Sequence, residues 1–398
     1  AAEGAVAALV DHPLETEIAQ IIVADVLHAF GELASAWRQK SAAHVIGLTG
    51  SNGKTTVKEM ISAILRQQAD VLMTQGNLNN DIGVPLTLTR LQDEAWAVIE
   101  MGANHRGEIR YLTNLVKPDI ALLNNAGRAH LEGFGSLQGV AESKAEIIEG
   151  LGENGVFVCH GDSEWLPMWR GLAGNRKLVT FGATEQVDVR LIEESIRCNW
   201  DEKGFTQTFS FTLAGEQFSL SIPLAGRHNC MNAVAAVAVA YEAGVDVQDA
   251  SAALAALKPV QGRLTPISCE RYRVLDDTYN ANPDSVTAAI GLLNELPGRS
   301  VLVLGDLAEL GEGAEQQHAN LGEVARDAGV DLLLTLGDMS RHAAEAFGDG
   351  AFATASLDEI DRLLNEKLVE GDTVLVKGSR ASAMERVVQL LINAGVQN

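Results

Sequence analysis

The stretch Leu48-Thr49-Gly50-Ser51-Asn52-Gly53-Lys54-Thr55-Thr56 follows the apolar run Val45-Ile46-Gly47-Leu48 and leads into a helical pattern. A strand, a glycine-rich turn and a helix start in this order are typical of a phosphate-binding loop, because backbone N–H groups and the helix N-terminus attract an anion. The lysine adds charge for the β- and γ-phosphates, and the threonine after it can bind Mg²⁺. The strict spacing has Gly at position 48, so the loop is a variant, and its glycines could instead make only a tight turn. The stretch predicts a nucleotide phosphate site made by Gly50, Ser51, Asn52, Gly53, Lys54, Thr55 and Thr56.

Length and composition indicate a soluble multidomain enzyme. The chain has 398 residues, which at about 100 to 200 residues per domain predicts two or three domains. No apolar run approaches the roughly 20 residues that span a bilayer, so we expect no membrane insertion. The net charge of −23 argues against binding nucleic acid, whose phosphates would repel such a surface. A bound nucleotide would therefore depend on local basic groups and a metal ion.

The cysteines and the first residues favour a cytoplasmic protein. Cys159, Cys198, Cys230 and Cys269 are scattered without CxxC spacing, which fits reduced thiols rather than a disulfide framework or a zinc site. The sequence opens at Ala1 with no basic segment and no apolar signal core. Nothing in it indicates export.

Apolar and helical segments alternate from residue 45 to about 257. Short apolar runs at 45–48, 97–101 and 119–124 and helix-period segments at 54–67 and 137–151 predict a mainly parallel sheet with helices on its faces. Residues 187–222 alternate with period two and predict antiparallel strands added at an edge. An Ala-rich helix is expected at 229–243.

A second alternation begins after Gln261-Gly262-Arg263, with apolar runs at 272–275, 301–304, 332–336 and 373–377. It predicts a second α/β domain of Rossmann-like type. Residues 1–40 contain one strand candidate at 5–10 and one helix candidate at 23–38, too little for an independent core. The expected division is a partial N-terminal domain at 1–40, a P-loop-type ATP-binding domain at 41–260 and a C-terminal domain at 261–398.

Two polar segments follow strands of the expected central sheet. Glu100 ends the run 97–101, where open α/β sheets place ligands, and is a candidate Mg²⁺ ligand; the alternative is a solvated charge at a strand end. His130 follows Asn124-Asn125-Ala126-Gly127-Arg128-Ala129 and could bind a second divalent ion. The His130 assignment is the weaker one, since Mg²⁺ prefers oxygen and a lone His is more often structural.

The order of motifs along the chain resembles the Mur ligase superfamily over essentially its whole length. The motifs are TGSNGKTT, EMGANHRGEI, AHLEGFGS, GRHNCMNAVAA, QGRL, DDTYNANPDS and LGDLAELG. TGxNGKT also occurs in folylpolyglutamate synthetase, so the combination carries the specificity. EMGANH, and the lack of the Asp-Asn-Pro-Arg motif of the diaminopimelate-adding members, favour the members that add D-Ala-D-Ala.

The resemblance implies a reaction in peptidoglycan precursor synthesis. ATP would phosphorylate the terminal carboxylate of UDP-N-acetylmuramoyl-tripeptide, and the amine of D-Ala-D-Ala would displace phosphate from the acyl phosphate. Such an enzyme mainly positions two anions that repel each other and neutralises their charge. The implied cofactors are ATP and Mg²⁺, the partners are these small-molecule substrates, and we expect a monomer.

The resemblance also implies roles for the phosphate and metal ligands. Lys54 would bind the γ-phosphate, and Thr55 with Glu100 would hold one Mg²⁺. His130 and a carbamylated Lys144 would serve a second ion. Lys144 lies in a helical segment and would otherwise be taken as a surface lysine; carbamylation converts it to an oxygen ligand.

Further residues implied by the resemblance surround the nucleotide. Asn229 and Asn232, one helical turn apart, match purine-contacting amides. Arg263, counted with the catalytic residues, and Asp277 match groups that reach the phosphates and the ribose from the C-terminal domain. The segment 377–382 resembles the loop near the incoming D-Ala-D-Ala, with a basic helix start as the alternative.

Other assignments stay open from the sequence. The family has a small N-terminal domain that binds the UDP-muramoyl group, and only about 40 residues precede the ATP-binding domain here, so UDP-binding residues are not assigned. A folylpolyglutamate synthetase-like ligase is the alternative within the class. A P-loop phosphotransferase or NTPase without a peptide substrate is the alternative outside it, although the NKxD motif of switch GTPases is missing from the sequence.

Overall fold

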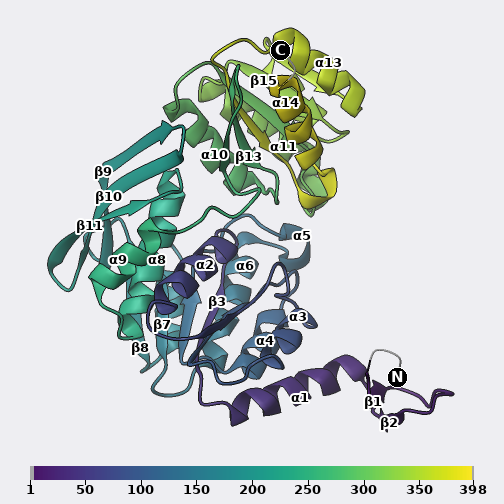
Figure 1. The fold of residues 1–398 in the computed structure, drawn as a ribbon, viewed down its shortest axis with the longest axis vertical. Coiled ribbons are helices and arrows are strands. Elements are labelled where there is room, and N and C mark those ends of the chain that lie inside the picture. Colours follow the sequence, from purple (N-terminus) through teal and green to yellow (C-terminus); the bar gives the residue numbers. More distant parts are fainter. Residues whose placement is uncertain (1–3, 397–398) are drawn as a thin grey trace.

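The computed structural model describes residues 4–396, which build two parallel-rich sheets one after the other along the chain (Figure 1). Within these residues the central sheet has nine strands in the order β11-β10-β9-β8-β7-β6-β3-β5-β4. Its strands are β3 His44–Thr49, β4 Val71–Met73, β5 Trp96–Glu100, β6 Ile120–Leu123, β7 Val156–His160, β8 Lys177–Gly182, β9 Val189–Asp201, β10 Gly204–Leu213 and β11 Glu216–Ile222. Its helices are α2 Lys54–Leu65, α3 Gly83–Leu88, α4 Glu108–Val116, α5 Leu131–Phe134, α6 Leu137–Ala145, the 3-10 helix η1 Glu146–Gly150, α7 Leu166–Ala173, α8 Arg227–Glu242 and α9 Val247–Ala255.

The expected alternation of strands and helices is confirmed in the central sheet. β3 to β8 pair in parallel, and β9, β10 and β11 pair antiparallel at one edge, as residues 187–222 predicted. Side chains of β3 alternate between the faces: Ile46 and Leu48 pack with α2 and α8, whereas Val45 packs with α3 and α4. The expected helix at 137–151 is two elements, because α6 ends at Ala145 and η1 continues in 3-10 geometry.

The second sheet has the order β12-β13-β17-β14-β15-β16 within the described residues. All of its pairings are parallel except β12 with β13. Helices α10 and α11 pack on one face and α13 and α14 on the other, which is a Rossmann-like arrangement. The elements are β12 Thr265–Ser268, β13 Arg273–Asp277, β14 Ser300–Gly305, β15 Leu332–Leu336, β16 Ala351–Thr354, β17 Thr373–Lys377, α10 Pro283–Glu295, η2 Gly311–Gly313, α11 Ala314–Asp327, α12 Arg341–Phe347, α13 Leu357–Lys367, η3 Arg380–Ser382 and α14 Glu385–Val396.

The two sheets share apolar contacts at the turn between β9 and β10. Phe205 is 4% exposed and belongs to the same apolar cluster as Leu264 and Leu275 of the C-terminal part. Trp200 contacts Phe205 with tilted rings whose centroids are 4.8 Å apart, and the Arg273 guanidinium lies 5.8 Å from the Trp200 ring centre. The hairpin of the first sheet therefore completes the core of the second.

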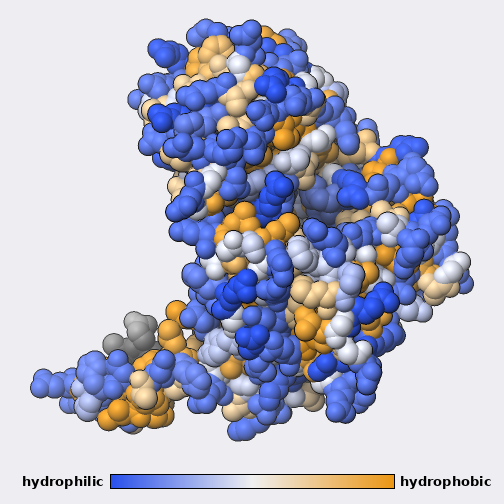
Figure 2. Space-filling model, turned by 180° about the vertical axis from the view of Figure 1, so that it is seen from behind, coloured by the Kyte–Doolittle hydropathy of each residue, from blue (hydrophilic) through white to orange (hydrophobic). Residues whose placement is uncertain are grey.

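The N-terminal segment is an arm beside the central sheet (Figure 1). Strands β1 Ala7–Val10 and β2 Ala19–Ile22 pair in parallel, and α1 Val26–Lys40 leads to β3. The expected strand and helix are present, whereas β2 was not predicted. Figure 2 shows orange, apolar surface on this arm, where Val6 is 85% exposed.

The described residues contain no helix that is both long and apolar enough to cross a bilayer. All four cysteines are free thiols.

Candidate active site

The phosphate-binding loop joins β3 to α2 and is braced by the neighbouring strand end. Ser51 exchanges hydrogen bonds with Gly127 through its hydroxyl, which accepts from the Gly127 N–H at 2.9 Å and donates to its carbonyl at 3.0 Å. The Asn125 amide accepts from the Asn52 N–H at 2.8 Å and donates to the Asn52 carbonyl at 2.9 Å. The loop therefore has a fixed shape before any ligand binds.

Gly53 occupies a position that needs glycine. It begins α2 with φ of 77°, a left-handed conformation that a side chain disfavours. A Cβ there would come 2.6 Å from the Asn232 amide oxygen. Asn232 in turn donates to Asn229 at 3.2 Å, and both side chains are buried. The two predicted purine-contacting amides thus lie directly behind the phosphate loop. The Asn124 amide holds Asn232 in place there by donating to it at 3.0 Å.

Lys54 folds back over the loop. Its Nζ donates to the carbonyl oxygens of Gly50 at 2.7 Å and Ser51 at 3.3 Å. Desolvation lowers the pKa of Lys54; the Glu100 carboxylate opposes this and Arg263 adds to it. An anion that accepts from this ammonium would replace two carbonyl oxygens with a full charge, which is the stronger interaction. Thr56 follows in the first turn of α2.

Glu100 ends β5 beside the loop and is 2% exposed. Its Oε1 accepts from the Asn79 amide at 2.8 Å, while its Oε2 is buried and has no hydrogen-bond partner among the described residues. A buried carboxylate oxygen without a donor is costly, and a cation would remove the cost. The site therefore fits the expected Mg²⁺ at Glu100. Thr55, whose hydroxyl accepts from Arg263 at 2.9 Å, is buried at the start of the same helix.

Lys144 is a buried lysine and not a surface one, with 1% of its surface exposed. Its Nζ lies 3.4 Å from the Ala103 carbonyl oxygen and 5.1 Å from the centre of the Phe134 ring. Burial and then the charge of Lys54 lower the pKa of Lys144 well below its usual value, against the raising effect of Glu108 and Glu146. A neutral amine is the form that reacts with CO₂, so the environment fits a carbamate.

His130 also lies against Phe134, in an edge-on arrangement with ring centroids 6.5 Å apart. It has φ of 53°, a left-handed conformation rare for a side chain. Burial lowers the pKa of His130, and the Glu309 carboxylate raises it. Among residues 4–396 no three His, Cys, Asp or Glu side chains converge as a preformed metal site. A second ion between His130 and Lys144 would thus depend on the carbamate oxygen.

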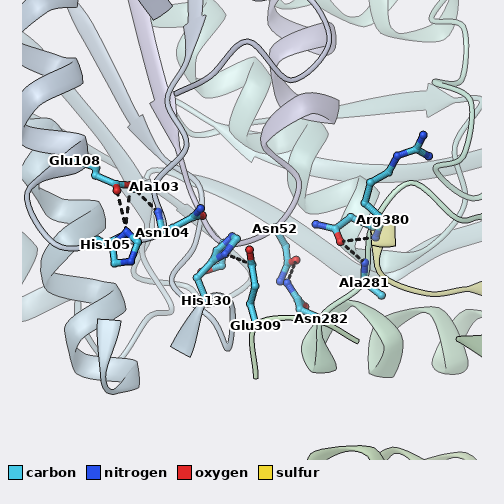
Figure 3. Close-up of polar contacts among 12 residues, drawn as sticks. Asn52, Ala103, Asn104, His105, Glu108, His130, Ala281, Asn282, Glu309 and Arg380 are labelled. Carbon is cyan, nitrogen blue, oxygen red and sulfur yellow. Dashed lines mark hydrogen bonds and ion pairs between the residues drawn. The ribbon is translucent and has the colours of Figure 1, made fainter. Parts of the chain in front are cut away.

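Residues of the C-terminal part cross to the loop. Figure 3 shows His130 facing Glu309 and Asn52 facing Asn282. Asn282 donates to Asn52 at 2.7 Å, and Arg128 N–H donates to Asp284 at 2.6 Å. The phosphate loop therefore lies between the carboxyl ends of the strands of the central sheet and those of the C-terminal sheet.

Arg263 also crosses the boundary, with its guanidinium donating to Thr55 and stacked 4.1 Å from the Tyr279 ring centre. Asp277 does not reach the loop in this structure. It accepts from Lys377 at 2.5 Å and from the Leu264 N–H at 3.2 Å. Segment 377–382 leaves β17 through Lys377 and turns into η3, a single 3-10 turn rather than a basic helix start.

Sequence reasoning missed Asn79, His228 and Glu309. His228 lies in the first turn of α8; burial lowers its pKa to about 4, while Asp277 opposes this shift and Lys377 adds to it. Glu309 lies in the LGDLAELG motif, but its left-handed φ of 62° and its contact with His130 arise only in the folded protein. Asn79 stands in the Gly/Asn-rich segment Gln75-Gly76-Asn77-Leu78-Asn79-Asn80 after β4, and the rule used for Glu100 did not reach it because a strand of 3 residues is too short to be recognised from its pattern.

The strand order, the loop and the opposed second sheet define an α/β enzyme with a P-loop nucleotide site completed by a Rossmann-like domain. Residues 48–240 match the Mur ligase middle domain, and residues 262–380 match the Mur ligase, glutamate ligase domain. The chain belongs to the Mur ligase family.

Two relatives from different bacteria carry the same name. UDP-N-acetylmuramoyl-tripeptide–D-alanyl-D-alanine ligase of Escherichia coli (strain K12) is 46% identical over 410 residues, covering 99% of this chain and 87% of the relative. The Bacillus subtilis (strain 168) protein of that name is 37% identical, covering 94% and 82%. The crystal structure of MurF from Acinetobacter baumannii superimposes with a TM-score of 0.91 at 35% identity, covering 97% of this chain and 84% of that one.

Two further structures bear on ligands and alternatives. MurF from Thermotoga maritima, solved in complex with ADP, has a TM-score of 0.87 at 29% identity, covering 98% of this chain and 89% of that one. Folylpolyglutamate synthase from Mycobacterium tuberculosis has a TM-score of 0.71 at 18% identity, covering 92% and 94%. The second likeness shows a shared fold alone, so the folylpolyglutamate synthetase alternative is not favoured.

Proposed function

We propose that this chain joins D-Ala-D-Ala to the terminal carboxylate of UDP-N-acetylmuramoyl-tripeptide at the expense of ATP, a step in peptidoglycan precursor synthesis. One observation carries the proposal: 46% identity over essentially the whole chain to a protein named for this reaction. The loop at Gly50–Lys54 and the two opposed sheets supply a site of the right kind. A phosphotransferase without a peptide substrate would leave the second sheet and its contacts without a role.

The chemistry follows from the charges around the loop. The tripeptide carboxylate attacks the γ-phosphorus of ATP, the bond to the β-phosphate oxygen breaks, and ADP leaves. The D-Ala-D-Ala amine then attacks the acyl carbon, loses a proton and expels inorganic phosphate. Lys54 and the loop N–H groups hold the transferred phosphoryl group, and Arg263 approaches it from the C-terminal part.

We propose Mg²⁺ as the metal cofactor. Thr55 and Glu100 would hold one ion, and His130 with carbamylated Lys144 a second. The ions supply positive charge that screens the repulsion between ATP and the acceptor carboxylate. The unpartnered Glu100 Oε2 and the lowered pKa of Lys144 support these assignments.

We also propose the division of labour along the chain. Residues 41–260 bind ATP, with Asn229 and Asn232 near the base; residues 261–398 supply Arg263, Asp277 and the segment 377–382 for the ribose and the incoming dipeptide; residues 1–40 belong to the part that holds the UDP-linked acceptor. The enzyme acts as a cytoplasmic monomer in this proposal.

Omission of single substrates tests the function. With ATP, Mg²⁺, UDP-N-acetylmuramoyl-tripeptide and D-Ala-D-Ala all present, phosphate release and a UDP-linked pentapeptide of the expected mass should appear together. Removing the tripeptide or the dipeptide should stop steady phosphate release. Sustained ATP hydrolysis without either would contradict the proposal and favour an NTPase.

A further inference from the structure

The loop between β4 and α3 holds the end of β5 through Asn79. The Asn79 side-chain amide donates to Glu100 Oε1 at 2.8 Å, and its backbone carbonyl accepts from the Gly102 N–H at 2.8 Å. A Cβ on Gly102 would come 2.8 Å from the Asn79 amide oxygen, so only the lack of a side chain at Gly102 lets Asn79 approach this closely. Asn79 thus contacts the strand end on both sides of Met101.

The same loop is anchored to the helix of the phosphate loop. Thr74 accepts from the Glu100 N–H at 2.9 Å through its hydroxyl. Its carbonyl accepts from Lys58 Nζ at 2.7 Å, and Lys58 in α2 is 1% exposed. The frame that carries Asn79 is therefore tied to both β5 and α2.

The consequence lies in the two oxygens of one carboxylate. The Asn79 amide occupies Oε1 of Glu100 and thereby fixes the rotation of the carboxylate plane. Oε2 is then left buried, with no donor in the part of the chain that the structure describes. Because a carboxylate free to rotate would share donors between its oxygens, the asymmetry depends on Asn79.

We propose that Asn79 is a positioning residue that aims Glu100 Oε2 at the divalent cation of the ATP site. The inference rests on the proposed function, because it takes Glu100 as a metal ligand. Groups that orient a ligand in this way usually change metal affinity roughly 10- to 100-fold when removed.

Mn²⁺ binding tests the inference without turnover. Electron paramagnetic resonance would measure free Mn²⁺ in titrations of the full chain with equimolar ADP, for the unaltered protein, N79L, E100Q and the double variant. Asn77 is exposed in the same loop, so N77L is the matched control. We expect roughly 10- to 100-fold weaker Mn²⁺ binding in N79L, less than a twofold change in N77L, and unchanged ADP binding in EDTA for both. The apparent KM for Mg²⁺ should rise in N79L more than kcat falls.

Each outcome decides the matter. Unaltered Mn²⁺ affinity in N79L would overturn the proposed role of Asn79. A further loss of affinity when N79L is added to E100Q would do the same, because Asn79 would then act independently of Glu100. Neither result would affect the metal assignment of Glu100. Equal Mn²⁺ affinity in E100Q and the unaltered protein would remove the metal assignment of Glu100 and this inference with it. If N79L does not fold by circular dichroism, N79A removes the same donor with less bulk and carries the same expectation.

Discussion

The two sheets both carry charged side chains at the carboxyl ends of their strands, but only one set is paired. In the C-terminal sheet Asp277 binds Lys377 at 2.5 Å, and Asp306 accepts from the N–H groups of Met339 and Ser340. At the central sheet Glu100, the last residue of β5, keeps a buried oxygen without a donor among the described residues, and Lys144 of the adjoining helix α6 is buried against an aromatic ring. Paired charges hold a surface in shape, whereas unpaired buried ones need a ligand to complete them. From this comparison we expect the phosphate and metal ligands on the central sheet and mainly supporting groups on the C-terminal sheet.

The comparison predicts its largest effect at Lys54. Lys54→Ala should lower kcat about a thousandfold, the upper range for removing one donor to a developing anion. The fold should persist, because this lysine contacts loop carbonyls and packs in no apolar cluster. Phosphate-release kinetics and thermal unfolding would measure both, with the exposed Lys40→Ala as control. Near-normal turnover in a folded Lys54→Ala protein would remove the loop assignment.

Lys144→Ala should lower kcat about a hundredfold, as expected for loss of a metal-site group. Short carboxylic acids such as acetate should restore part of the activity by replacing the carbamate oxygens in the space left by the side chain. Lys54→Ala serves as the control that these acids do not rescue. Intact-mass analysis or density showing an unmodified Lys144 in active enzyme would count decisively against carbamylation.

Lys377→Met tests the paired side of the comparison. Asp277 would keep its charge and lose its main donor, so the free energy of unfolding should fall by about 1–3 kcal/mol. The double change Asp277→Asn with Lys377→Met should recover much of that loss. Chemical denaturation would measure it, and equal stability of all three proteins would mean that this pair does not support the sheet.

The smallest expected effect concerns contact between the two parts. Arg263→Ala should reduce kcat about tenfold, equivalent to about 1.4 kcal/mol.

We further expect the free protein to be open and the protein to become compact when an ATP analogue and acceptor bind, because ligands that touch both parts favour the closed form. Small-angle scattering would show a smaller radius of gyration. No change in that radius, together with full activity of Arg263→Ala, would refute closure.

The sequence was sufficient where the relevant signal is local. The strand, turn and helix at 45–65 are contiguous, and the two alternating series gave the parallel sheets because period and length distinguish strands from helices. β4 and β2 were missed, since runs of 3 and 4 residues carry too little periodicity. β7 and β8 were also missed, because they lie between the clearer helical pattern at 137–151 and the alternating pattern at 187–222.

The site was harder to predict because its contacts join distant segments. Glu309 reaches His130 and Asn282 reaches Asn52 only once the second sheet faces the first. The burial of Lys144 was likewise not visible in the sequence, since its helical segment gives no sign that Phe134 and Ala103 cover it. The family resemblance pointed to this lysine, and the fold supplies the physical reason.

The hairpin that inserts Phe205 into the second core restricts how the two parts can move. Burying a phenylalanine contributes roughly 1.5–3 kcal/mol. An opening or closing movement that pulled the hairpin out of the second core would lose this contribution and is therefore disfavoured. A rotation about Phe205 keeps that contact and swings the far side, where Glu309 meets His130. The hairpin would then act as a pivot. The boundary at residue 260 would separate the two parts in the sequence, but the core of the second part would still include Phe205 from the first. Residues 1–260 expressed alone would expose Phe205 and Trp200 and be prone to self-association.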